Sequence, residues 1–136
     1  MNNRGQVGIE YMIVIGFVTL AIMSVLTLAY FYSDEIKTNI KLNQVESFAT
    51  QLIAKSESVF WAGEPSKNTI ELYLPENVVS IVLSVDGVLI TTKVGAVENV
   101  RLFESDVPLS GTIPITPGLK RISLEAQETQ TLITVN

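Results

Sequence analysis

Glu10 is the residue whose position in this sequence is hardest to explain by structure alone. It stands directly before the uncharged apolar run of residues 11–32 and four residues after Gln6. In an α-helix this spacing puts Gln6 and Glu10 on one face. One interpretation is that an acidic side chain in a first helical turn interacts favourably with the positive end of the helix dipole. A second interpretation begins with the residues that precede Gln6.

Residues 1–5 have the character of a leader that is removed from the chain. The segment is short and polar, and it carries Arg4. In a secretory signal peptide the apolar segment precedes the cleavage site and is discarded. Here the apolar run follows the leader, so a processed chain would keep it.

Residues 4–11, Arg-Gly-Gln-Val-Gly-Ile-Glu-Tyr, together with the apolar run resemble the class III signal peptide of archaeal type IV pilin-like proteins. The resemblance is confined to this N-terminal part of the chain. It implies that a prepilin-type peptidase cleaves between Gly5 and Gln6, and that Glu10 becomes the fifth residue of the mature chain. Gly8 stands where the family often has serine, which exchanges one small residue for another.

Cleavage at Gly5 would give Glu10 a chemical partner. The new N-terminus is an ammonium group on Gln6, one helical turn from the carboxylate. When such helices pack together away from water, an unpaired carboxylate is costly to bury, and an ammonium of the same or a neighbouring chain offsets that cost. We therefore expect Gln6 and Glu10 to act in assembly by helping to set the axial stagger between chains.

The element that carries these groups is long enough to cross a membrane. As a helix rising ~1.5 Å per residue, residues 11–32 cover ~33 Å, about the thickness of the hydrocarbon layer. Tyr11 and residues 30–32 place aromatic rings at the two ends, where such rings favour the headgroup level. Three hydroxyl side chains inside the run are each expected to donate to the carbonyl one turn earlier: Thr19, Ser24 and Thr27.

Catalysis and tight metal binding are poorly supported by the sequence. The chain has neither histidine nor cysteine, so the usual general base and the thiol nucleophile are missing. Glu104 and Asp106 flank Ser105 in an expected loop, but two carboxylates fall far short of the ligands that calcium takes. We predict no enzyme activity, no cofactor and no metal site.

The charge balance argues against nucleic acid as a partner. The formal net charge is −5, and the basic residues are dispersed along the chain. Nucleic acid favours clustered Lys and Arg. Loss of Arg4 with the leader would make the chain still more acidic.

After Asp34 the helix is expected to continue with an amphipathic pattern. Apolar residues recur at spacings of three, four and seven along one face: Ile36, Ile40, Val45, Phe48, Leu52, Val59 and Phe60. We interpret most of this stripe as the face by which the helix docks on its own domain. Gly63 and Pro65 then predict the end of an unbroken helix.

Beyond Pro65 the apolar pattern changes to a period of two, which is typical of strands. Strands are expected at residues 70–74, 79–85, 88–94, 99–103, 112–116, 119–127 and 131–135. Asp86 and Gly87 predict a hairpin turn, and Pro114 predicts an edge strand. The pattern is typical of an antiparallel sandwich or a small barrel-like sheet, and we favour the sandwich.

We therefore expect an α+β protein, a long N-terminal hydrophobic helix followed by an antiparallel β-sandwich-like domain, as in type IV pilins. Its parts are a leader (1–5), a helix (6–62) and a β-rich outer domain (66–136). Within the helix, residues 6–33 form the transmembrane segment or filament core, and residues 34–62 are amphipathic.

The resulting functional hypothesis is a pilin. Its precursor sits in the membrane, and the mature chain self-associates into a helical surface filament. By resemblance its further partners are an assembly ATPase and a membrane platform protein, and the filament's usual work is adhesion. The alternatives are a membrane-anchored extracytoplasmic binding domain that never polymerises, and a minor priming pilin.

Overall fold

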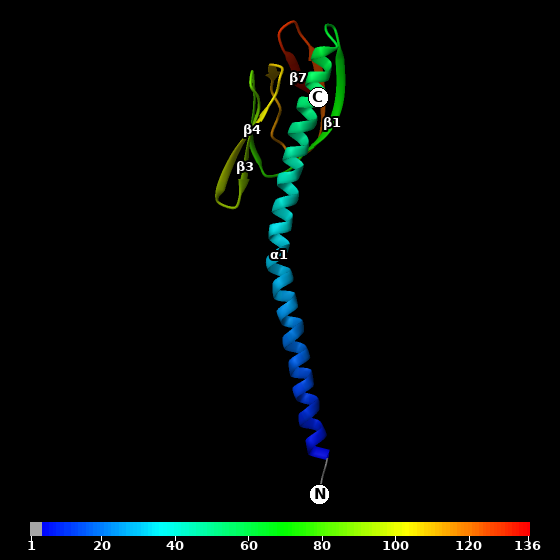
Figure 1. The fold of residues 1–136 in the computed structure, drawn as a ribbon, viewed down its shortest axis with the longest axis vertical. Coiled ribbons are helices and arrows are strands. Elements are labelled where there is room, and N and C mark those ends of the chain that lie inside the picture. Colours follow the sequence, from blue (N-terminus) through cyan, green and yellow to red (C-terminus); the bar gives the residue numbers. More distant parts are fainter. Residues whose placement is uncertain (1–3) are drawn as a thin grey trace. The chain divides into compact units, whose positions relative to one another are not determined.

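One long helix occupies the N-terminal part of the computed structural model, which describes the backbone of residues 4–136 and the side chains from Gly8 onward. The helix, α1, runs unbroken from Arg4 to Trp61 (Figure 1). Its start lies upstream of Gln6, where the mature helix was expected to begin. Of the predicted leader, residues 1–3 lie outside the described part of the chain.

The end of α1 follows the predicted signals. Gly63 has a φ of 79°, a left-handed conformation that glycine adopts without steric cost. Its N–H donates to the Phe60 carbonyl at 3.0 Å, and the Gly63 carbonyl accepts from Ser66 N–H at 2.9 Å. These bonds close the helix and turn the chain toward the first strand.

Two compact units share this chain, and their boundary falls within α1. One unit ends at Thr38 and the other comprises Asn39–Asn136. The first consists of helix in its described part. The second contains the C-terminal part of α1 and all the strands that the structure describes.

Seven strands in the described residues form two sheets (Figure 1). They are β1 (Lys67–Leu74), β2 (Val78–Ser84), β3 (Gly87–Val94), β4 (Val97–Glu104), β5 (Leu109–Gly111), β6 (Gly118–Ala126) and β7 (Thr131–Val135). The larger sheet has the order β1-β6-β7-β5 and the smaller has the order β2-β3-β4. The α+β class is thus confirmed, as is the hairpin predicted at Asp86 and Gly87.

The strand predicted at residues 112–116 is wrong. The strand in this region is β5, which ends at Gly111 and pairs with β7 in parallel, so the larger sheet is mixed and not wholly antiparallel. Pro114 and Pro117 have no N–H to donate to a ladder, which explains why pairing stops before them. The segment still packs against the domain, because Ile113 is buried there.

One face of α1 and the inner faces of both sheets make a single core. The helix contributes buried apolar side chains at a spacing of three and four, and these pack with β1, β3, β6 and β7. They are Val45, Phe48, Ala49, Leu52, Ile53 and Val59. The Thr131 hydroxyl of β7 also donates to the Ser56 carbonyl at 3.1 Å. The C-terminal part of α1 is therefore part of the domain's own core.

Candidate assembly surface

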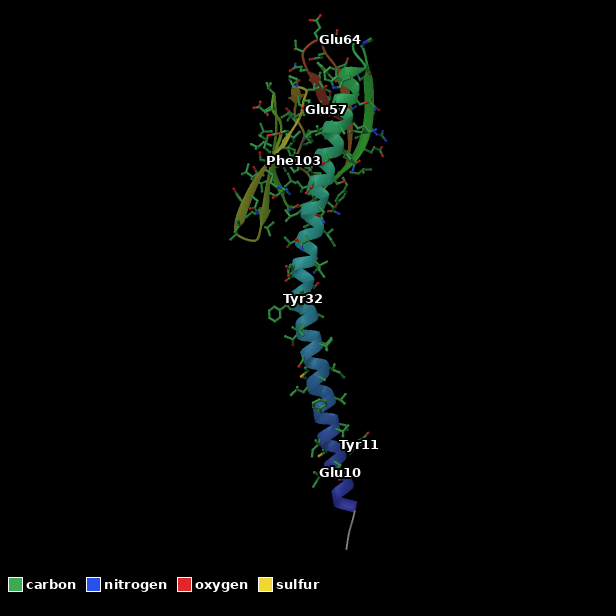
Figure 2. The ribbon with its side chains drawn as sticks, viewed as in Figure 1. Glu10, Tyr11, Tyr32, Glu57, Glu64 and Phe103 are labelled. Carbon is green, nitrogen blue, oxygen red and sulfur yellow. The ribbon has the colours of Figure 1, made fainter. Side chains whose placement is uncertain are left out.

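The N-terminal part of α1 presents apolar side chains on every side. From Ile9 to Tyr32 each large hydrophobic side chain is exposed, with Phe17 at 73% and Leu26 at 63%. Figure 2 shows side chains projecting all round the helix between Tyr11 and Tyr32. A helix that is apolar all round requires lipid or other protein around it.

By length and composition this helix is able to cross a membrane. Its most apolar window, within Gly8–Trp61, has a mean hydropathy of 2.5, and none of that window is buried inside the protein. The three hydroxyls donate as predicted to the carbonyls of Ile15, Leu20 and Met23, at 2.8 Å, 2.9 Å and 2.8 Å. Between Met12 and Ala29 no hydroxyl side chain then needs water as a hydrogen-bond acceptor.

Glu10 lies near the start of this surface, and its side chain is exposed. It has no ion-pair partner among the side chains that the structure describes from Gly8 onward. Gly5 and Gln6 lie in the backbone of α1, whereas the Gln6 side chain is outside the described part. The predicted pairing of Glu10 with a freed amine at Gln6 therefore stays a prediction.

Two isoleucines of the predicted docking stripe do not dock on the domain. Ile36 and Ile40 are 56% and 50% exposed, and burial begins only at Val45. They follow Asp34 and Glu35, which are charged and belong in water. The rest of the stripe is buried or half-buried, namely Val45, Phe48, Leu52, Val59 and Phe60, so most of the stripe docks on the domain as interpreted.

Glu57 has a role that the sequence did not reveal. Its carboxylate accepts the Asp106 N–H at 3.0 Å and the Ser105 hydroxyl at 3.5 Å, so α1 holds the loop after β4. Glu57 and Asp106 are far apart in the sequence, so no local sequence pattern predicts this contact. Glu57, labelled in Figure 2, thus positions the loop that contains Ser105 and Asp106, whereas Glu104, which was expected in this loop, is the last residue of β4.

In the part of the chain that the structure describes, no group of three or more acidic side chains is placed to hold an ion. Two hollows on the domain open to solvent beside α1, and Ser47 and Gln51 line both of them. The feature that needs a functional explanation is therefore the apolar surface of α1.

Comparison with known proteins adds no assignment: no family model, curated protein or solved structure matches the chain. The functional argument therefore rests on the residues and their arrangement.

Proposed function

We propose that this chain is the precursor of a structural subunit of a type IV pilus-like surface filament, in which residues 6–33 pack as the core and the β domain faces outward. The observation that carries the proposal is the all-round exposure of apolar side chains from Ile9 to Tyr32. Lipid satisfies this surface before assembly, and parallel copies of the same helix satisfy it afterwards.

The exposed isoleucines favour assembly over a simple membrane anchor. In an anchored monomer, hydrocarbon covers residues as far as Tyr32, and the charges of Asp34 and Glu35 mark the water beyond it. Ile36 and Ile40 would then lie exposed in water. Neighbouring helices packed along α1 would cover both side chains. An anchored monomer gives no reason for apolar side chains at these two exposed positions.

Processing and register complete the proposed mechanism. A prepilin-type peptidase removes residues 1–5, and the new ammonium of Gln6 meets a Glu10 carboxylate of the same or a neighbouring chain. Helices that slide out of register leave this carboxylate unpaired among apolar groups, which is costly. Burial of apolar surface contributes less on leaving lipid than on leaving water, so extraction requires an assembly ATPase and a membrane platform protein.

The proposal is tested by N-terminal sequencing of the chain recovered from cells, together with electron microscopy of sheared surface material. We expect Gln6 as the first residue and filaments containing the chain. An intact Met1 and an absence of filaments would support the anchored binding domain instead.

The role of Glu10 is tested by Glu10→Gln, with Glu35→Gln as the matched control. Both replace one exposed glutamate of α1 by its neutral isostere, but only Glu10 adjoins the proposed amine. Glu10→Gln should reduce filament yield or change the helical symmetry, and Glu35→Gln should do neither. Normal filaments with unchanged symmetry from Glu10→Gln would refute the charge-pair account of register.

A further inference from the structure

The outer face of the smaller sheet carries an apolar band. Val88 and Ile90 of β3 are fully buried, so Leu89 between them points to the opposite face. Leu89 is paired with Val82 of β2 and with Leu102 of β4, which places one apolar row across all three strands. We call Val82, Leu89, Val100 and Leu102 the β2-β3-β4 band.

Three members of the band are well exposed. Val82 and Leu102 are each 49% exposed, and Val100, in the next row opposite Thr91, is 60% exposed. Leu89 lies between them, half-buried by its neighbours. An antiparallel sheet with one face in water ordinarily carries polar side chains there, so this face departs from the expected alternation.

The outer face of the larger sheet is mixed: it carries charged pairs and one exposed apolar pair, Tyr73 of β1 opposite Leu119 of β6. There Arg121 of β6 bonds Glu71 of β1 at 2.8 Å, and Lys67 bonds Glu125 at 3.1 Å. These cross-strand ion pairs are directly opposed in the β1–β6 register. On the smaller sheet, by contrast, the apolar row of Val82, Leu89 and Leu102 runs uninterrupted across all three strands.

The size of the band limits what can cover it. Four partly exposed aliphatic side chains offer on the order of 300 Å² of apolar surface. A stable complex between separate proteins needs about 800 Å² from each partner. The band is too small to bind a protein that diffuses freely. It suffices for a partner that another contact already holds nearby, because such a partner has an effective concentration of about a millimolar or more.

A neighbouring copy of this chain meets that condition, because packed α1 helices would tether the domains beside one another. We infer that the β2-β3-β4 band is the contact through which the outer domain of one subunit packs on the domain of the next. This inference rests on the proposed filament. Since a contact between identical patches closes into dimers, a growing fibre requires the band to meet a different face of the next copy.

The experiment uses single-cysteine variants of the full chain, which contains no cysteine of its own. Val100→Cys places the probe in the band. Val85→Cys places it in the turn after β2, where the valine is 69% exposed and outside the band. The rate of reaction with a water-soluble maleimide is measured for each variant in detergent-solubilised monomers and in purified filaments.

We expect both thiols to react at similar rates in monomers. In filaments the reaction at position 100 should slow by about tenfold or more because the thiol loses solvent access, while the reaction at position 85 should be unchanged. Filaments in which position 100 reacts as fast as in monomers would overturn the band as a contact and leave the filament itself standing. Absence of filaments from the unaltered chain would instead refute the proposed function, and the inference with it.

Discussion

Two leucines of α1 provide the sharpest test that the C-terminal part of this helix belongs to the domain core and the N-terminal part does not. Leu52 is completely buried between the sheets, whereas Leu26 is 63% exposed in the N-terminal part. Truncating each to alanine removes the same atoms and changes helix propensity equally. The difference between the two variants therefore reports only what surrounds each side chain.

For Leu52→Ala the expected loss of domain stability is about 3 kcal/mol, the sum of lost transfer energy and a cavity among well-packed neighbours. This is roughly a hundredfold change in the unfolding equilibrium, and roughly a 15 °C fall in Tm for a domain of this size. Leu26→Ala should change the same free energy by less than about 0.5 kcal/mol, because the side chain contacts no part of the core.

The assay is thermal and urea unfolding of detergent-solubilised monomers, with the circular dichroism signal of the β domain as the readout. The same two variants are then assembled and their filaments are challenged with detergent. If the proposed filament forms, Leu26→Ala filaments should dissociate more readily than unaltered ones, because each subunit would lose apolar burial in the proposed core. A Tm for Leu52→Ala equal to that of the unaltered chain would refute the assignment of Leu52 to the core. Equal losses of Tm in the two variants would refute the claim that Leu52 lies in the domain core and Leu26 outside it.

Two further predictions concern the β domain. Gly87→Ala should destabilise it by several kcal/mol or prevent folding, because at its φ of 138° an added Cβ would lie 2.0 Å from the Phe103 carbonyl oxygen. Gly95→Ala, at a φ of 64° with open space around it, should cost only about 1 kcal/mol in the same urea unfolding assay. Glu57→Gln should weaken the bond to Asp106 N–H, costing about 1 kcal/mol, and hydrogen exchange at that amide should accelerate while exchange in β3 is unchanged. Unaltered exchange at Asp106 would contradict the role assigned to Glu57.

Local signals were enough to predict much of the fold. The lack of proline before Pro65 predicted an unbroken helix, and Gly63 predicted where it ends, because both effects act within one turn. The turn at Asp86 and Gly87 likewise predicted its hairpin from adjacent residues. These features depend on backbone conformation and hardly on distant parts of the chain.

The errors arise where a distant partner decides the structure. β5 is three residues long and pairs in parallel with β7, and no periodicity can identify so short a strand. Apolar periodicity placed Ile36 and Ile40 on the same face as Val45, but periodicity does not reveal how far along that face the domain extends. The contact of Glu57 with the loop at Asp106 is missed for the same reason.

The candidate site shows the same limit. The apolar run and the position of Glu10 are visible in the sequence because they are local in composition and spacing. The β2-β3-β4 band is not, since Val82, Leu89 and Leu102 become neighbours only through strand pairing. Single exposed apolar residues are common in strands, so each one alone indicates nothing. They indicate a surface only once the strand register shows that they lie side by side.

The hydrogen bond from Thr131 to Ser56 has a consequence for biosynthesis. It joins positions 75 residues apart, and at ribosomal rates of 5–20 residues per second the wait between them is about 4–15 s. During that interval the helix face around Leu52 has been made but has no β7 to cover it. The nascent chain therefore exposes two apolar surfaces during synthesis: the N-terminal part of α1, which is able to enter a bilayer, and the face around Leu52, which stays partly uncovered until β7 is made.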